Sequence, residues 1–237
     1  MHIRLPPLAL ATHIRSHYVP YVTITPSPFD PVALGCGVTA LMHCNPDNAA
    51  ARATQSDLFG QPLLPGLAYR DDIISRAEEA ALIARIEAAG LTPFQFQQWE
   101  GKRLTRSFGW TYDFQTGRFA PGEPIPDWTG PLRRKAACFA GLAPEDFEQL
   151  LLIQYGTGAG IGWHRDRPVF EHVVGISLGA PATMRFRRRA GARFERATAQ
   201  LAPRSIYHLS GEARDDWEHS IAAMAEPRWS VTFRSLR

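Results

Sequence analysis

Cysteine, lysine and long hydrophobic runs are all scarce in this sequence of 237 residues. The three cysteines, Cys36, Cys44 and Cys138, are widely spaced and form no C-x-x-C pair, which argues against a disulfide framework and against a cysteine-based zinc site. No stretch approaches the roughly 18 consecutive apolar residues of a membrane-spanning helix, and the apolar residues 5–11 contain two prolines. We therefore expect a cytoplasmic protein that has no membrane partner.

Basic charge is concentrated in the second half of the chain. The net charge is +3; residues 1–130 carry 10 basic and 12 acidic side chains, whereas residues 131–237 carry 16 and 11. Only two of the 26 basic residues are lysine, and the planar guanidinium of arginine suits phosphate and carboxylate groups. A GC-rich genome gives the same preference for arginine, so composition alone assigns no function.

Residues 1–60 differ in character from the rest of the chain. Prolines at positions 6, 7, 20, 26, 28 and 31 interrupt every periodic run, and only six charged side chains occur in this stretch. We expect a poorly ordered or irregular N-terminal extension. From residue 61 to residue 237 we expect one folded domain, with a helical part in residues 61–148 and a β-core in residues 149–237.

Local patterns predict helices first and short strands afterwards. Ser75 and Glu78 form a capping-box pattern before an apolar run with helical spacing that ends at Gly90. Residues 132–140 suit a second helix, and a short third one starts at Pro144. Seven β-rich runs follow: 150–155, 172–178, 182–188, 193–200, 204–209, 217–221 and 228–233. Their spacing of about ten residues predicts an α+β fold whose β-core is a sandwich, jelly roll or small barrel.

His164 and Asp166 are the strongest candidates for metal ligands. In an extended segment, residues i and i+2 point to the same side, so this H-x-D pair can present an imidazole and a carboxylate to one point. His219 lies on a predicted strand 53 residues after Asp166. Two histidines and one carboxylate leave three coordination positions open, as in the facial triad of non-haem Fe(II) oxygenases. Taken alone, an H-x-D pair is more simply explained by a His–Asp hydrogen bond at a strand end.

The last predicted strand offers a matching site for an anion. Arg228 and Arg234 are six residues apart and therefore share one face, while Val231 and Phe233 supply an apolar opposite face. Two inward-pointing arginines would be costly to bury without an anionic partner. The pattern suits a dicarboxylate with a keto-acid end; an exposed edge strand that ends in charges is the alternative.

Further motifs accompany these residues in a fixed order along the chain. They are Tyr155, Gly158, the run Gly175-Ile176-Ser177-Leu178-Gly179, and the run Ser210-Gly211-Glu212-Ala213-Arg214. Together with the H-x-D pair, His219 and the R-x5-R spacing, they resemble the AlkB family of 2-oxoglutarate- and Fe(II)-dependent dioxygenases over roughly residues 64–237. The resemblance implies a double-stranded β-helix, or jelly roll, preceded by N-terminal helices.

The resemblance also implies roles for individual residues. Three of them correspond to the ligands of the iron, and these are His164, Asp166 and His219. Three others correspond to residues that bind the cosubstrate 2-oxoglutarate, and these are Tyr155, Arg228 and Arg234. The chain departs from the family pattern at Ile153, where an asparagine is usual, and at Pro168, where an acidic residue often lies near the target base.

The activity implied by the resemblance is an oxidation that consumes O2 and 2-oxoglutarate and releases succinate and CO2. Because a hydroxylated N-methyl group breaks down to formaldehyde, the resemblance implies oxidative demethylation or hydroxylation of alkylated or modified DNA or RNA, in DNA repair or RNA modification. One alternative is a hydroxylase of a protein or small molecule. Another is a non-catalytic, metal-containing nucleic-acid-binding protein, which would not need the arginine pair. We expect a monomer.

An aromatic-rich segment is the first candidate for contact with the substrate. Residues 102–114 interleave bases and aromatics and correspond to the part that forms a lid over the nucleotide in the family. Arg106 could hold a phosphate there. Phe108, Trp110 and Tyr112 alternate, which predicts a shared strand face that could stack on an extruded base. Phe108 is explained equally well as core.

A basic cluster is the second candidate. Arg187, Arg188 and Arg189 lie in its centre, with further arginines nearby and one acid, Glu195. Such a cluster could bind phosphates with an affinity that falls as salt rises. A solvated hairpin is the simpler alternative.

Overall fold

The computed structural model describes residues 64–96, 99–112 and 119–237, which belong to one compact unit. The irregular extension expected for residues 1–60 lies outside the described residues. Within the described part, none of the helices has the length and apolar character needed to cross a membrane.

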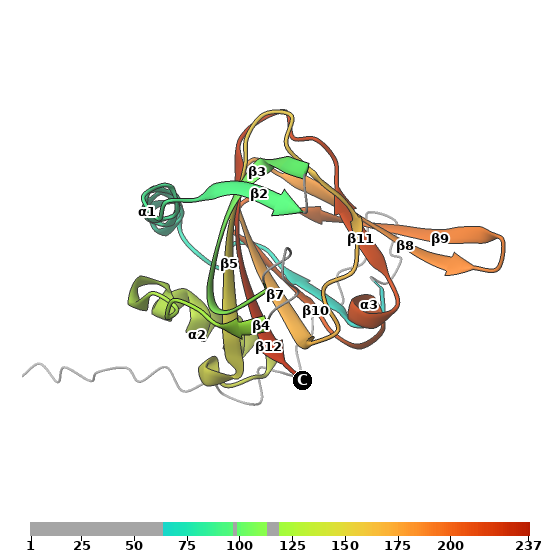
Figure 1. The fold of residues 1–237 in the computed structure, drawn as a ribbon, viewed down its shortest axis with the longest axis horizontal. Coiled ribbons are helices and arrows are strands. Elements are labelled where there is room, and N and C mark those ends of the chain that lie inside the picture. Colours follow the sequence, from blue (N-terminus) through green and yellow to red (C-terminus); the bar gives the residue numbers. More distant parts are fainter. Residues whose placement is uncertain (1–63, 97–98, 113–118) are drawn as a thin grey trace, which may run out of the picture. The chain divides into compact units, whose positions relative to one another are not determined.

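Two antiparallel sheets form the core of the described unit (Figure 1). The larger sheet has the strand order β1-β10-β7-β12-β5-β3-β2, with β4 paired to β3, and the smaller sheet has the order β6-β11-β8-β9. The larger sheet consists of β1 (Leu67–Arg70), β2 (Thr92–Phe96), β3 (Trp99–Tyr112), β4 (Phe119–Pro121), β5 (Phe147–Tyr155), β7 (Phe170–Gly179), β10 (Ser205–Leu209) and β12 (Arg228–Leu236). The smaller sheet consists of β6 (Ile161–His164), β8 (Ala182–Ala190), β9 (Arg193–Leu201) and β11 (Glu218–Ile221).

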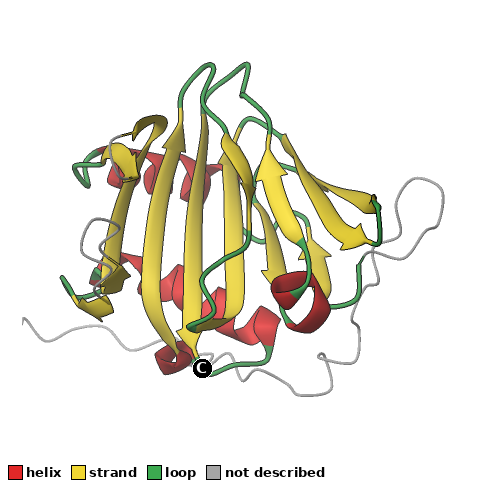
Figure 2. Cartoon of the chain, turned by 45° about the vertical axis from the view of Figure 1, so that its right-hand side comes forward, coloured by secondary structure: helices red, strands yellow, loops and turns green. Residues whose placement is uncertain are grey.

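Helices cover one face of the larger sheet. Figure 2 shows its strands side by side with helices behind them, and these are α1 (Arg76–Glu87) and α2 (Gly130–Ala140) of Figure 1. The 3-10 turns η2 (Asp127–Thr129) and η3 (Pro144–Asp146) flank α2, and the short α3 (Gly211–Asp215) joins β10 to β11. The predicted capping box is confirmed, because Ser75 Oγ accepts from the Glu78 amide while the Glu78 carboxylate accepts from the Ser75 amide.

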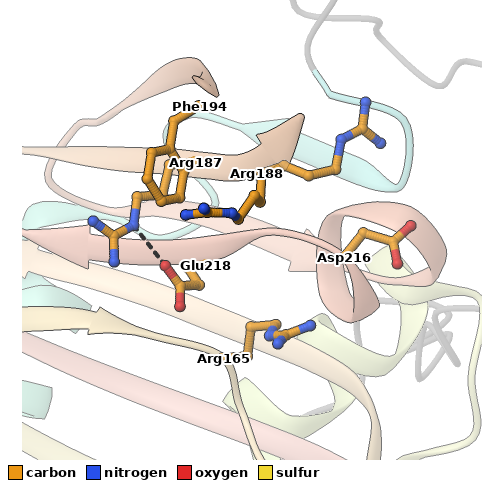
Figure 3. A pocket seen from close by; sticks show the side chains of 7 residues that line it. Arg165, Arg187, Arg188, Phe194, Asp216 and Glu218 are labelled. Atoms are coloured by element: carbon orange, nitrogen blue, oxygen red, sulfur yellow. Dashed lines mark hydrogen bonds and ion pairs between the residues drawn. The ribbon is translucent and has the colours of Figure 1, made fainter. Parts of the chain in front are cut away.

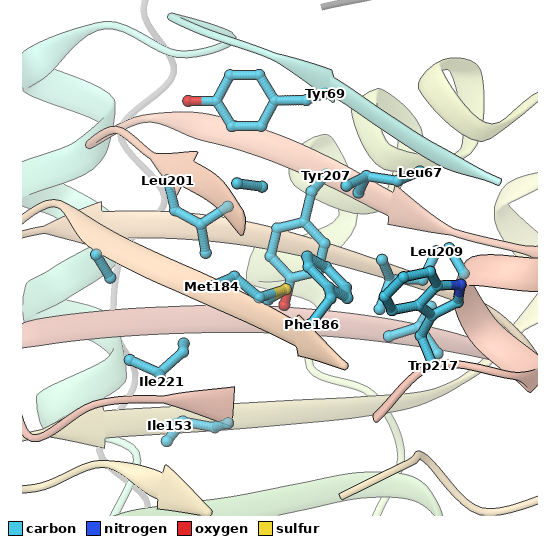
Figure 4. Close-up of a cluster of buried hydrophobic side chains, with 14 of the residues drawn as sticks. Leu67, Tyr69, Ile153, Met184, Phe186, Leu201, Tyr207, Leu209, Trp217 and Ile221 are labelled. Carbon is cyan, nitrogen blue, oxygen red and sulfur yellow. The ribbon is translucent and has the colours of Figure 1, made fainter. Parts of the chain in front are cut away.

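The larger sheet is buried on both faces, which creates two separate apolar clusters. On the helix side, Ile86 and Leu132 pack with Val231 and Phe233. On the other side, strands of both sheets contribute the cluster drawn in Figure 4, including Tyr207. Because side chains alternate along β12, its arginines point between the two sheets. The fold thus places charged groups in an interior that is otherwise apolar.

The expected α+β architecture is confirmed, with two differences. The seven predicted runs are β5 and β7 to β12, each within a few residues of its expected bounds. The first difference is that β1, β4 and β6 were not predicted, because three or four residues carry too little periodicity to stand out. The second is that α1 and α2 are interspersed with β1 to β4 and do not form a block before the sheets.

Candidate active site

Two histidines face each other across neighbouring strands of the smaller sheet. His164 ends β6, His219 lies in β11, and the two are direct partners in the antiparallel register. Their ring centroids are 4.3 Å apart. Burial, assisted by His164, lowers the pKa of His219 from 6.5 to about 3, against an opposing effect of Asp166. The His219 imidazole is therefore neutral at pH 7, which is the form that binds a metal ion.

A backbone hydrogen bond sets the tautomer of His164. Its Nδ1 lies 2.9 Å from the carbonyl oxygen of Gly162. A carbonyl oxygen can only accept, so we assign the proton to Nδ1, which leaves the lone pair on Nε2. Hydrogen bonds of this kind orient metal-binding imidazoles in proteins.

Asp166 follows β6 directly and is held from two sides. Its Oδ2 lies 3.7 Å from Nε2 of His219, while Arg234 donates to Oδ1 from Nε at 3.1 Å and from Nη2 at 2.9 Å. Burial alone would raise the pKa of this carboxyl, but the positive charge of Arg234, followed by the effect of His219, holds it well below its ordinary value. Asp166 is therefore an ionised carboxylate in a buried position.

The three predicted iron ligands approach one another in pairs. His219 contacts both His164 and Asp166. Among the residues that the structure describes, no group of three histidine, cysteine or acidic side chains is gathered closely around one point. The residue types and the two pair distances fit a ligand set for Fe(II).

The two predicted cosubstrate arginines have different surroundings. All three guanidinium nitrogens of Arg234 are engaged, because Nη1 donates to Oε1 of Gln149 at 2.9 Å in addition to the two bonds to Asp166. Arg228 is fully buried, and only its Nε has a partner, Ser177 Oγ at 3.0 Å. No described residue accepts a hydrogen bond from its Nη1 or Nη2. Its guanidinium carbon lies 5.1 Å from the ring centroid of Tyr155.

Tyr207 belongs to the same interior, although no sequence motif indicated this. Burial raises its pKa to about 12, and the charges that act on it include those of Arg228, Asp166 and Arg234. Its ring lies directly over Gly175, its register partner in β7; a Cβ built on Gly175 would come within 2.1 Å of the ring. Gly175, the first residue of the Gly175–Gly179 motif, therefore leaves room for the Tyr207 ring because it has no side chain.

Arg103 is a second residue that sequence reasoning missed. It lies in β3, is only 8% exposed, and has its guanidinium carbon 3.9 Å from the ring centroid of Phe94. Burial lowers its pKa, with Tyr155 acting in the opposite direction. Among the described residues it has no acidic partner. A buried cation near Tyr155 that has no acidic partner in the described part of the chain suits an anionic ligand.

Trp110 is connected to the candidate site by a series of aromatic rings. Its ring stacks on Phe119 with centroids 5.0 Å apart, Phe119 meets Phe170 edge-on at 6.0 Å, and the Arg234 guanidinium lies 5.2 Å from the Phe170 ring. Phe108, in contrast, belongs to the cluster on the helix side.

The predicted common face of Phe108, Trp110 and Tyr112 is therefore wrong for the first two residues. Gly109, with φ of +74°, interrupts the alternation between them, and β3 pairs with β4 from Trp110 onward. The side chain of Tyr112 lies outside the described part of the chain.

Arg106 does not reach the site. Its guanidinium donates to the carbonyl oxygen of Ala89, just after α1, and forms an ion pair with Glu123 at 2.8 Å. Arg106 therefore attaches β3 to the end of α1, and its predicted role as a substrate ligand is not supported by this position.

The predicted basic cluster is partly neutralised by acids. Arg187 pairs with Glu218 at 2.5 Å. Arg188 pairs with both Glu195, at 2.6 Å, and Glu212, at 2.8 Å. Of the three arginines named from the sequence, only Arg189 lacks an acidic partner among the described residues.

The chain belongs to the 2OG-Fe(II) oxygenase superfamily, whose family model matches residues 70–235. This confirms the class of enzyme that the sequence motifs indicated, and the relatives below confirm the AlkB-like resemblance.

Two relatives with curated names are similar in sequence. The chain is 29% identical over 185 residues to the "Alkylated DNA repair protein ALKBH8 homolog" of Arabidopsis thaliana, covering 67% of this chain and 51% of that protein. It is 29% identical over 183 residues to the "tRNA (carboxymethyluridine(34)-5-O)-methyltransferase ALKBH8" of Macaca fascicularis, covering 73% and 27%. The chain thus spans about half of the first relative and about a quarter of the second.

Solved structures share the fold at low sequence identity. "The structure of OsALKBH1" superposes with a TM-score of 0.60 at 15% identity, covering 74% of this chain and 99% of that one. A prolyl-4-hydroxylase from Pseudomonas putida superposes with a TM-score of 0.50 at 13% identity, covering 73% and 94%. These likenesses confirm the double-stranded β-helix that the resemblance predicted.

Proposed function

We propose that this chain is an Fe(II)- and 2-oxoglutarate-dependent dioxygenase that oxidises alkylated or modified bases of nucleic acid. The observation that carries the proposal is Arg228, a fully buried guanidinium with two unpaired nitrogens beside Tyr155. A buried cation without an acidic partner is costly unless an anionic ligand completes it. Family membership identifies 2-oxoglutarate as the anion to test first.

The donor chemistry of the site suits Fe(II). The proposed ligand atoms are Nε2 of His164, Nε2 of His219 and Oδ2 of Asp166, two neutral imidazoles and one carboxylate. When bound, iron with 2-oxoglutarate supplies the oxidant, since decarboxylation of the keto acid to succinate is coupled to hydroxylation of a substrate C–H bond by O2. Arg234 keeps Asp166 ionised and oriented, and Gln149 in turn holds Arg234.

The proposed cosubstrate pocket lies between the sheets. The two free nitrogens of Arg228 would hold a carboxylate of 2-oxoglutarate as a bidentate pair. Tyr155 and Tyr207 would contribute phenol donors, and burial further favours the protonated form of Tyr207 by raising its pKa. Arg103, beside Tyr155, would add a second positive charge to the anion-binding interior.

Two observations support a nucleic-acid substrate. The rings of Trp110 and Phe119 are stacked, Phe119 meets Phe170 edge-on, and this series of rings reaches Arg234; aromatic side chains of this kind can stack on an extruded base. The names of the two relatives with curated names refer to alkylated DNA and to tRNA.

The decisive experiment separates cosubstrate binding from turnover. The melting temperature of the chain is measured with Mn(II) and increasing 2-oxoglutarate, and succinate and formaldehyde are then measured with Fe(II) over a panel of methylated oligonucleotides, nucleosides, peptides and small metabolites. We expect the melting temperature to rise with 2-oxoglutarate, and we expect succinate and formaldehyde to be released with at least one oligonucleotide. The Arg228→Met variant should show neither.

Each outcome has a defined meaning. A shift with turnover of a peptide or metabolite alone would retain the dioxygenase and reject the nucleic-acid substrate. Oligonucleotide binding without any 2-oxoglutarate-dependent shift would reject the enzyme and favour a non-catalytic binder.

A further inference from the structure

The smaller sheet has an outer face that is rich in arginine and aromatic side chains. Along β8, Met184 and Phe186 point into the core between the sheets, and the alternation sends Arg185, Arg187 and Arg189 to the opposite side. No described helix packs on this side in the way α1 and α2 cover the larger sheet, and β8 and β9 extend away from the body of the unit (Figure 1).

On this face the guanidinium groups lie against aromatic rings. The Arg187 guanidinium carbon is 4.5 Å from the ring centroid of Trp163, in β6, and 4.8 Å from that of Phe194, in β9. Two further arginines, Arg189 at 5.6 Å and Arg196 at 6.0 Å, surround Phe194. Phe194 is 36% exposed, and among the described residues it is the one large hydrophobic side chain that is exposed. The result is a surface of flat, alternating cationic and aromatic groups.

The charges on this surface are not all balanced. Glu218 pairs with Arg187, as Figure 3 shows. Arg189 and Arg196 have no acidic partner in the described part of the chain. Two guanidinium groups are therefore available to external anions, on either side of an exposed ring.

A hollow adjoins this surface. It has a volume of about 540 Å³ and is lined by four arginines, one aromatic ring and two acids: Arg165, Arg187, Arg188, Arg189, Phe194, Asp216 and Glu218 (Figure 3). This volume falls within the range of pockets that hold ligands of small-molecule size, so it can receive a nucleotide-sized group.

We propose that the outer face of the smaller sheet, with Trp163, Arg187, Arg189, Phe194 and Arg196, docks a single-stranded segment of nucleic acid. Unpaired bases stack on aromatic rings and on guanidinium planes, while phosphates pair with free arginines, and a duplex offers no such unstacked bases. Trp163 precedes His164 in β6 and points to the other side of the sheet, so the docked nucleotides lie on the side of the sheet opposite the metal ligands, away from the reacting one. This inference rests on the proposed function, because it concerns the substrate of that same site.

Binding of fluorescein-labelled single-stranded RNA and DNA oligonucleotides by the full chain tests the proposal. Fluorescence anisotropy gives the affinity over a range of salt concentrations for the wild type, for Phe194→Ala and Phe194→Trp, and for the double variant Arg189→Gln/Arg196→Gln. The matched control is Arg134→Gln, which removes an exposed arginine on α2, behind the larger sheet. The shift in melting temperature with Mn(II) and 2-oxoglutarate is measured for every variant.

The variants should differ in kind. Phe194→Ala should weaken binding about five- to hundredfold with no change in the salt slope, and Phe194→Trp should restore it. The double arginine variant should lower the log–log salt slope by about 1.4, that is about 0.7 for each phosphate lost from a single strand. Arg134→Gln should match the wild type.

Three results would overturn the docking surface. They are an unchanged affinity and slope in the Phe194 and arginine variants, equal binding of duplex and single strand, and equally tight binding of polyglutamate. The melting shift separates this failure from failure of the proposed function. If the melting temperature of the wild type rises with 2-oxoglutarate while the variants bind the oligonucleotide normally, the proposed oxygenase stands and the docking surface is rejected. If Phe194→Ala loses oligonucleotide binding while no protein shows that rise, the docking surface stands and the proposed oxygenase is rejected.

Discussion

Arg228 is a residue whose burial makes sense only with a ligand. Because its two free nitrogens are desolvated and unpaired, Arg228→Met should stabilise the ligand-free protein by about 1–3 kcal/mol, while it removes the response to 2-oxoglutarate. Urea unfolding without ligand and thermal shift with ligand measure the two effects. A destabilised variant would show that the cation is satisfied in a way that the structure does not reveal.

Arg234 is the matched comparison, since it lies on the same strand and face. Arg234→Met leaves the buried Asp166 carboxylate without its main partner and should destabilise the protein by about 3–5 kcal/mol. Opposite signs for the two substitutions are the expected outcome. Equal destabilisation by the two substitutions would mean that Arg228, like Arg234, has a stabilising partner in the ligand-free protein.

Tyr207 gives a prediction at the level of one hydroxyl. Tyr207→Phe keeps the ring over Gly175 and removes only the donor, so the fold should be unchanged, whereas the 2-oxoglutarate concentration for half-maximal thermal shift should rise about tenfold or more. Gly175→Ala should displace the ring and affect stability as well as binding. A Tyr207→Phe protein with unaltered ligand response would remove Tyr207 from the pocket.

The residue scale also shows what a sequence can and cannot reveal. The spacing of Arg228 and Arg234 was sufficient to predict their common face, because alternation in a strand is local. Their different partners were not predictable, since Asp166, Gln149 and Ser177 come from three other segments of the chain.

At the scale of elements, the turn after β6 carries Asp166 and is held by α3. Arg214, in α3, donates from Nη2 to the carbonyl oxygens of Arg167 and Phe170, the latter at 2.8 Å. Arg214→Lys keeps the charge, but its Nζ ends about one bond short of the Nη2 position from which both carbonyls are held, and we expect about ten- to hundredfold weaker Mn(II) binding. Anaerobic calorimetry measures the affinity. The substitution should disturb the contact between His219 and Asp166 without disturbing the fold. We therefore expect the urea midpoint of Arg214→Lys to equal that of the wild type.

Elements with a strong local signal were the predictable ones. Ser75 and Glu78 predict the start of α1, because a capping box satisfies backbone amides within the first turn of the helix. The interruption of the side-chain alternation at Gly109 in β3 was missed. A glycine in a strand is compatible with either a continuous alternation or a bulge, and only the pairing with β4 decides between them.

At the scale of the whole described unit, the site arises from long-range pairing. β6 pairs with β11 and β12 lies between β5 and β7, so residues from distant segments meet in one interior. The order of motifs along the chain is consistent with this topology, but no local pattern states which strands are neighbours. That is why the fold class was predictable, while the positions of Tyr207 and Arg103 in this interior were not.

The buried groups of this interior make the stability of the metal-free protein depend on pH. The pKa of His219 is about 3 when folded and near 6.5 when unfolded, so the unfolded chain binds one more proton between these values, and stability falls as pH is lowered through this window. The slope for this one proton is at most about 1.4 kcal/mol per pH unit. The pKa of Asp166 is also lowered, so its contribution is present above its ordinary value near 3.8 and is lost as pH falls below it. Urea unfolding of chelator-treated protein at a series of pH values should show the decline beginning near pH 6.5, and His219→Gln should reduce it. A free energy of unfolding that stays level from pH 7 to pH 4 in the wild type would contradict a buried, neutral His219.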